Sequence, residues 1–148
     1  MMANGYIREV NRKDIDDLSN LSNSLLTYLF KEAAPKWFVD ELLPKAYEER
    51  ILDKKYEQFV YILDEKIVGI LTIKEKNQIF HLFVDAKYHQ RGIAKKLWEF
   101  TKTNYEIKNM KVNASLYAIK VYESFGFIKE GEEKIFQELK YQPMIYKR

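Results

Sequence analysis

The sequence of 148 residues contains no cysteine, only three prolines and only five glycines. Without cysteine the protein has no disulfide, no thiolate nucleophile and no zinc site with sulfur ligands. The glycines, at positions 5, 69, 92, 126 and 131, form neither a Walker P-loop nor the G-x-G-x-x-G pattern of dinucleotide-binding proteins. The G-x-S-x-G and H-E-x-x-H patterns are also absent, which excludes the common serine-hydrolase and zinc-protease signatures.

The sequence also lacks long apolar runs and a secretion signal. No apolar run approaches the ~18 residues of a membrane span. Residues 1–5 lack the basic and apolar blocks of a signal peptide. His81 and His89 are the only imidazoles available as metal ligands. We therefore predict a cytoplasmic protein with no membrane partner and no metal.

Charged residues of both signs are mixed along the chain. The 25 basic and 22 acidic residues leave a net charge of +3 and alternate locally, as in Glu48-Glu49-Arg50. Such mixing cancels the local field that would attract a phosphate backbone, so we predict no nucleic-acid partner. A nucleic-acid-binding module stays an alternative, which rests on the pI near 8.8 and on tyrosines near lysines, such as Tyr56.

Composition and periodicity predict one domain of alternating strands and helices over residues 1–148. The chain is 47% hydrophobic and 32% charged, which is typical of a globular domain. The periodicities predict, in order, a strand at 6–10, a helix from 11 to about 30, a broken helical region at 35–52, a hairpin of strands at 58–63 and 67–74, a strand at 79–84, a helix at 92–105, a strand at 110–112, a helix at 115–126 and strands at 134–139 and 144–147. The strand at 79–84 is almost continuously apolar, which predicts a central strand covered on both faces.

The segment His89-Gln90-Arg91-Gly92-Ile93-Ala94 lies between that strand and the next helix. Unpaired N–H groups and the helix dipole at such a position attract an anionic phosphate. Gly92 lets a main chain approach a pyrophosphate without a Cβ in the way, while Arg91 and Lys95 add positive charge. The same six residues also fit an ordinary helix start with a tight turn.

A second segment follows the next strand and contains Asn113, then Ala118-x-x-x-Tyr122, then Gly126-Phe127. In this order the two segments resemble the GNAT superfamily of acyl-CoA-dependent N-acyltransferases. That family has a pyrophosphate loop of the form Q/R-x-x-G-x-G/A, followed by Asn, A-x-x-x-Y and G-F. The resemblance covers residues 58–127. The sequence departs from the pattern at His89, where the family has Gln or Arg, and has the permitted Ala94 in place of Gly.

The resemblance implies a fold, a co-substrate and the residues that hold it. The implied fold class is α/β (α+β), a mixed, mostly antiparallel central sheet flanked by helices. The implied co-substrate is acetyl-CoA, with its pantetheine arm on the main chain of Phe83 and Val84. Asn113 would contact the cofactor or order its surroundings. The residues implied to cradle the pyrophosphate are His89, Gln90, Arg91, Gly92, Ile93, Ala94 and Lys95.

Two candidate catalytic residues follow. An amine that attacks a thioester expels a thiolate, and a phenol with a pKa near 10 can protonate that sulfur as charge develops. The resemblance gives this role to Tyr122, although a tyrosine beside Val121 on a helix face is also an ordinary core residue. His81 is the first candidate for the base, with Glu75 second; a lone histidine on an apolar strand is also commonly a core residue.

We therefore predict an N-acetyltransferase that moves an acetyl group from acetyl-CoA to a primary amine of a small molecule or peptide by direct attack in a ternary complex. The alternative is a non-catalytic acyl-CoA sensor that contacts a partner protein. A homodimer is left open. Acidic residues could attract a cationic acceptor, but the lysines among them are more typical of a solvated helix face; the acids are Asp40, Glu41, Glu48, Glu49 and Asp53.

Overall fold

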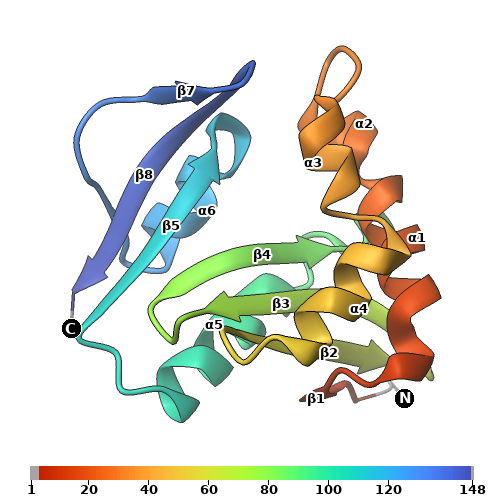
Figure 1. Cartoon of the computed structure of the whole chain (residues 1–148). Helices are drawn as coiled ribbons and strands as arrows, with labels where there is room; N and C mark the ends of the chain where they lie inside the picture. Colours follow the sequence, from red (N-terminus) through yellow and green to blue (C-terminus); the bar gives the residue numbers. More distant parts are fainter. Residues whose placement is uncertain (1–3, 148) are drawn as a thin grey trace.

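The structure, a computed structural model, describes residues 4–147. Its sheet has the strand order β1-β2-β3-β4-β5-β8-β6, with β7 paired to β8 (Figure 1). Every pairing is antiparallel except that of β4 with β5. The strands are β1 (Tyr6–Glu9), β2 (Tyr56–Leu63), β3 (Lys66–Lys74), β4 (Gln78–Val84), β5 (Asn109–Ser115), β6 (Ile128–Lys129), β7 (Lys134–Phe136) and β8 (Leu139–Lys147).

Helices cover both faces of this sheet. The α-helices are α1 (Ile15–Ser24), α2 (Leu26–Leu29), α3 (Lys36–Asp40), α4 (Pro44–Leu52), α5 (Ile93–Asn104) and α6 (Ile119–Ser124), and the 3-10 turns are η1 (Arg12–Asp14), η2 (Ala86–Tyr88) and η3 (Leu116–Ala118). The neighbours Ile70 and Leu71 on β3 belong to two different core clusters, one with Leu18 of α1 and one with Leu97 of α5. Alternate side chains of a strand point to opposite faces, so β3 is covered on both. The strand predicted to be covered on both faces is β4, where Phe83 is buried in the first cluster and Leu82 is partly buried against the second. Within residues 4–147, no helix has the length and apolar character needed to cross a membrane.

The predicted helix from 11 to about 30 is not one helix. Asn11 and Asp14 form the predicted capping box, but it caps the 3-10 turn η1. α1 then ends near Leu25, and α2 begins directly after it. Near the break the hydroxyl of Ser24 donates to the carbonyl of Leu21 at 2.6 Å. Side-chain bonds of this kind compete with the helical ladder, which gives a local reason for the interruption.

The C-terminal strands also differ from the prediction. β7 ends at Phe136, a two-residue turn at Gln137 and Glu138 follows, and β8 then runs without a break through Pro143. The carbonyl of Pro143 accepts a hydrogen bond from the N–H of Glu130 at 2.9 Å. The nitrogen of Pro143, which has no N–H to donate, therefore faces the edge of the sheet just beyond the last residue of β6. A missing donor is tolerated at such an edge.

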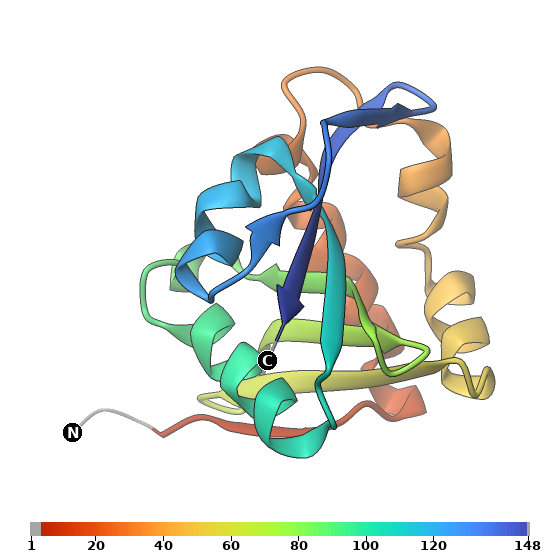
Figure 2. The ribbon, with the colours of Figure 1, turned by 90° about the vertical axis from the view of Figure 1, so that its left-hand side faces the viewer.

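β4 and β5 pair over two residues, at the beginning of β4, and then separate. Their parallel register joins Gln78 to Lys111 and Ile79 to Val112, and no further pair follows in the described residues. Directly after this point the register of β3 and β4 shifts, which leaves Phe80 as an extra residue of β4. Figure 2 shows β5 and β8 running steeply across the first four strands. The divergence opens the middle of the sheet between β4 and β5.

Candidate functional site

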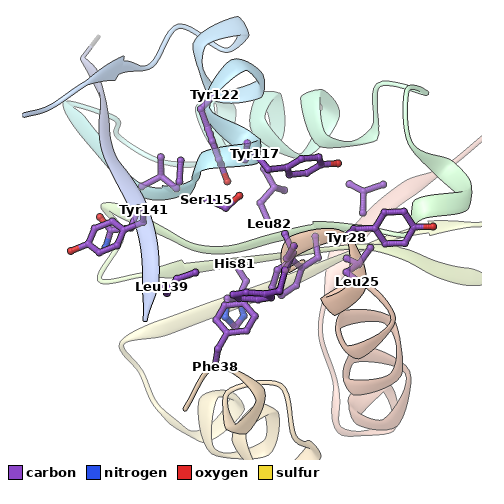
Figure 3. A pocket seen from close by; sticks show the side chains of 18 of the residues that line it. Leu25, Tyr28, Phe38, His81, Leu82, Ser115, Tyr117, Tyr122, Leu139 and Tyr141 are labelled. Atoms are coloured by element: carbon purple, nitrogen blue, oxygen red, sulfur yellow. The ribbon is translucent and has the colours of Figure 1, made fainter. Parts of the chain in front are cut away.

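A cleft lies where β4 and β5 separate, and side chains from α2, η3 and α6 complete its walls (Figure 3). Its volume is about 180 Å³, whereas one water needs only ~10–15 Å³. An organic group therefore fits. The cleft brings together six residues singled out from the sequence: His81, Phe83, Val84, His89, Asn113 and Tyr122.

The edge of β4 that faces the cleft carries the main-chain groups of Leu82 and Val84. On the other edge, the N–H of Asp85 donates to the carbonyl of Val68 on β3 at 2.9 Å. Main-chain groups alternate between the two edges of a strand, so the N–H and C=O of Phe83 face β3, as those of Asp85 do. The open edge can therefore accept an extended ligand that pairs like an added strand. The register favours Leu82, which the sequence analysis missed, over Phe83 for this role.

His89 ties the loop after β4 to this edge. Its Nε2 lies 2.7 Å from the carbonyl oxygen of Val84. A carbonyl oxygen only accepts, so Nε2 carries the proton and donates it. The ring of Tyr28, at the end of α2, packs edge-on against the imidazole with centroids 6.2 Å apart. His89 thus has a role inside the protein that explains a histidine where the family pattern has Gln or Arg.

The N-terminus of α5 is open to an anion. Gly92 has φ +77°, and a Cβ at this position would meet nothing within 4 Å. The first helical hydrogen bond runs from the N–H of Lys96 to the carbonyl of Gly92 at 3.0 Å. The N–H groups of residues 93–95 lie before this first bond of the helix and therefore have no acceptor within the helix. Together with the exposed guanidinium of Arg91, these groups fit a pyrophosphate.

Tyr122 projects from α6 into the cleft (Figure 3). It also packs edge-to-face on Phe125 and Phe127, at centroid distances of 6.0 and 5.4 Å. Burial raises the pKa of its phenol well above the ordinary value, so the hydroxyl stays protonated at neutral pH. The residue is therefore part of the core and a protonated donor in the cleft at the same time.

His81 reaches the cleft from the opposite side (Figure 3) and is paired with Glu41, which lies outside the cleft lining. Its Nε2 lies 3.3 Å from Oε2 of Glu41. Burial lowers the pKa of His81, and neighbouring Arg50 lowers it further, while the contact with Glu41 acts in the opposite direction. The imidazole is therefore neutral at neutral pH, with its Nε2–H directed at the carboxylate. Nδ1 is then an acceptor, and it has no hydrogen-bond partner among the described residues.

Some predicted residues lie elsewhere. Glu75, the second candidate for the base, lies in the exposed turn between β3 and β4 and does not line the cleft. Glu41 was named only as one acid among several, because it is 40 residues from His81 and no local pattern links them. Tyr28 and Tyr141 line the cleft without belonging to any sequence motif. The described part of the chain holds no group of three or more histidine, aspartate or glutamate side chains placed to bind a metal ion.

Comparison with known families assigns the chain. The family model for the acetyltransferase (GNAT) domain matches residues 25–148, which is most of the chain. The protein therefore belongs to this family, and the resemblance inferred from the two motifs is confirmed.

Three relatives illustrate the relationship. Human N-acetyltransferase 8 is 34% identical over 84 residues, and the match covers 47% of this chain but only 37% of the human protein. The PaiA N-acetyltransferase of Thermoplasma acidophilum, solved with coenzyme A, superposes with a TM-score of 0.78 at 12% identity over 98% of this chain and 99% of that one. A dodecameric spermidine N-acetyltransferase of Vibrio cholerae has a TM-score of 0.70 at 20% identity, over 97% and 93%. The structural matches confirm the predicted mixed, mostly antiparallel fold.

Proposed function

We propose that the protein transfers an acetyl group from acetyl-CoA to a primary amine of a small molecule or peptide. The observation that carries this proposal is that three features lie in or directly beside one cleft, whose lining includes His89 but not residues 90–95. The three features are the open main-chain edge of β4, the amide-lined start of α5 and the protonated hydroxyl of Tyr122. A non-catalytic acyl-CoA sensor would need the first two but not the third, so the position of Tyr122 favours catalysis.

The chain offers separate contacts for each part of the co-substrate. The free N–H of Val84 and both main-chain groups of Leu82 suit the amides of a pantetheine arm, since the Val84 carbonyl is already bonded to His89. Residues 90–95 suit the pyrophosphate through their amides, with charge from Arg91 and Lys95. Asn113 lines the same cleft from β5.

Acetyl-CoA supplies a thioester whose carbonyl carbon is open to attack. The attacking nitrogen forms the C–N bond of the amide while the C–S bond breaks, and the sulfur leaves with the bonding electrons. Tyr122 can donate its proton or a hydrogen bond to that sulfur. Neutral His81 can accept the proton that the ammonium must lose, and Glu41 stabilises the resulting imidazolium. In sum, an ammonium ion and a thioester give an amide, a thiol and one proton.

The cytoplasmic location, the single-domain organisation, the absence of a nucleic-acid partner and the possible homodimer stay predictions. The activity of the family supports an amine as the acceptor.

Binding of the co-substrate tests this proposal. Saturating acetyl-CoA should raise the melting temperature, because a ligand at 100 times its Kd stabilises a folded protein by about 2.7 kcal/mol. Lys95→Glu, at the exposed start of α5, should weaken binding about tenfold or more. Lys108→Glu, an equal charge change on the exposed loop after α5, is the matched control and should bind as the wild type does. An unchanged melting curve, or equal losses in the two variants, would contradict the proposal.

A further inference from the structure

A second hollow meets the cleft from the other side of the β4–β5 split. The two share six lining residues: Phe38, Phe80, His81, Asn113, Leu139 and Tyr141. The second hollow extends away from α5, towards α3 and the β7–β8 hairpin, and has a volume of about 320 Å³. We call it the aromatic pocket, because five rings line it: Trp37, Phe38, Phe80, Phe136 and Tyr141. A molecule in the aromatic pocket can therefore reach the cleft at His81.

The outer wall of the aromatic pocket is made by segments far apart in the sequence. The indole N–H of Trp37 on α3 donates to the carbonyl of Gln137, in the β7–β8 turn, at 3.0 Å. The same indole packs edge-to-face against Phe136, with centroids 5.1 Å apart. Figure 1 shows α3 and the β7–β8 hairpin facing each other across the split. These contacts close one side of the pocket with apolar surface.

The lining of the aromatic pocket carries one full charge, that of a carboxylate. Its titratable lining residues are Glu41, His81 and Tyr141, and no lysine or arginine from residues 4–147 lines it. His81 is neutral, as described above, so Glu41 supplies the only full charge of the lining. The guanidinium of Arg50 lies behind the wall, over the ring of Tyr47 and bonded to the carbonyl of Glu41 at 2.7 Å. A single anion among aromatic faces favours a single cation.

We propose that the acceptor is a primary amine with one ammonium group on an apolar or aromatic body, such as an arylalkylamine or a medium-chain alkylamine. This inference rests on the proposed function. The ammonium binds at Glu41, whose Oε2 also lies 3.3 Å from Nε2 of His81, and the rings of Trp37 and Phe136 hold the body. The nitrogen then lies at the junction of the aromatic pocket and the cleft, where the thioester would be.

A polyamine is the main competitor, because more acids lie nearby. Asp40, Glu49 and Asp53 line an adjacent hollow that shares Glu41 with the aromatic pocket. Two of these acids already have cationic neighbours. Asp40 pairs with Lys36 at 2.9 Å, and Glu49 lies 4.0 Å from Lys45. A second ammonium would therefore find a partly neutralised surface, whereas an apolar body finds the rings.

Binding and turnover test the inference with three amines. 2-Phenylethylamine, ethylamine and spermidine are compared in a thiol-release assay with acetyl-CoA. We expect kcat/KM for 2-phenylethylamine to exceed that for ethylamine by about 30-fold, since burial of a ring of that size favours binding by that order. It should also exceed that for spermidine by about tenfold. Binding is measured separately by fluorescence, because Trp37 lines the pocket while Trp98 is buried in the core.

Paired variants locate the site. Glu41→Gln should raise the KM and the Kd for 2-phenylethylamine about tenfold and leave the Kd for acetyl-CoA unchanged. Glu49→Gln, in the adjacent hollow, should change neither constant for 2-phenylethylamine. Trp37 keeps its signal in both variants, so a folded protein can be verified by its melting curve and its fluorescence.

The outcomes separate this inference from the proposed function. If acetyl-CoA binds but spermidine is the better acceptor, or Glu49→Gln impairs the enzyme while Glu41→Gln does not, the inference is overturned and the acetyltransferase remains. If acetyl-CoA binds and no amine changes the fluorescence of Trp37, the inference is likewise overturned. If acetyl-CoA does not bind, the proposed function fails, and the fluorescence titration still decides whether the pocket holds the amine.

Discussion

At the scale of single residues, burial sets opposite proton roles for His81 and Tyr122. Both side chains are held in their neutral forms, because burial lowers the pKa of the imidazole and raises that of the phenol. A neutral imidazole has a lone pair that accepts a proton, whereas a neutral phenol has a proton to donate. The two side chains reach the cleft from opposite sides, so an acceptor and a donor face the same space (Figure 3).

Removal of the Tyr122 hydroxyl tests its role as a donor. Tyr122→Phe should lower kcat about 100-fold, in the range that general acid catalysis contributes, and leave the Kd for acetyl-CoA within about threefold. Tyr117→Phe is a matched control, because Tyr117 lines the same cleft from η3 but is 62% exposed and so keeps its hydroxyl in water. Steady-state kinetics and calorimetric titration give the two constants. Equal kcat values for the two variants would remove Tyr122 from the mechanism.

At the scale of elements, a buried carboxylate joins the first strand to the first helical turn. Asp14 at the end of η1 accepts two hydrogen bonds from the guanidinium of Arg8 on β1, at 2.8 and 2.9 Å. It also accepts one from the N–H of Asn11 at 2.8 Å. Burial on its own would raise the pKa of Asp14, but the bonds from Arg8 and Asn11 outweigh it, and the pKa is lowered. The pair therefore stabilises the charged form in the folded state.

The contribution of Asp14 to stability should depend on pH in one direction. Its pKa is lower when folded than when unfolded, where it is about 3.9, so the stabilisation is complete above that value and is lost as the pH falls through the folded pKa. Asp14→Asn should lose about 1–3 kcal/mol at pH 7 and progressively less below about pH 4.

Urea denaturation at several pH values measures this difference. Asp16→Asn, at an exposed position in the first turn of α1, is the control and should lose less than about 1 kcal/mol at any pH. An Asp14→Asn deficit that is the same at pH 7 and pH 3 would show that the lost interaction is not one of charge.

At the scale of the whole molecule, α5 holds together the two halves of a sheet that pair over only two residues. Leu97 lies against β3 of the first half, so closely that a Cβ at Gly69 would come within 3.2 Å of its Cδ1. Its neighbour Trp98 packs on Phe127 and Tyr146 of the second half, at centroid distances of 4.9 and 5.0 Å. This helix keeps the halves in contact behind the split, so that the cleft stays open in front.

Two substitutions at Trp98 test this bridging role. Trp98→Ala should destabilise the fold by about 3–5 kcal/mol, because it leaves a large cavity in the core. Trp98→Phe should cost clearly less. The ring contacts are partly kept, and the indole N–H, which has no hydrogen-bond partner in the described part of the chain, is removed. Free energies of unfolding from urea titrations measure both; equal losses would show that the ring contacts contribute little.

The sequence predicted the parts of the fold that depend on neighbouring residues. The hairpin at 64–65 forms because the polar residues there accept the positive φ values of 51° and 64° that a two-residue turn requires. Gly92 marked the helix start for the same kind of local reason. The break near Leu25 was not predicted although its cause is local, the bond from the Ser24 hydroxyl to the carbonyl of Leu21. The continuity of β8 through Pro143 was not predicted because it depends on a distant contact, the hydrogen bond from the N–H of Glu130.

By itself the sequence determined the family, the order of elements and the loop that begins α5, because local propensity and short motifs encode them. Tertiary structure decided three features of the site. It paired Glu41 with His81, it directed the main-chain groups of Leu82, and not those of Phe83, to the open edge of β4, and it joined Trp37 to Gln137 across 100 residues. Each depends on strand register or on long-range packing. The residues next to a position in the chain do not specify these, because its partners come from elements that only the folded sheet brings together.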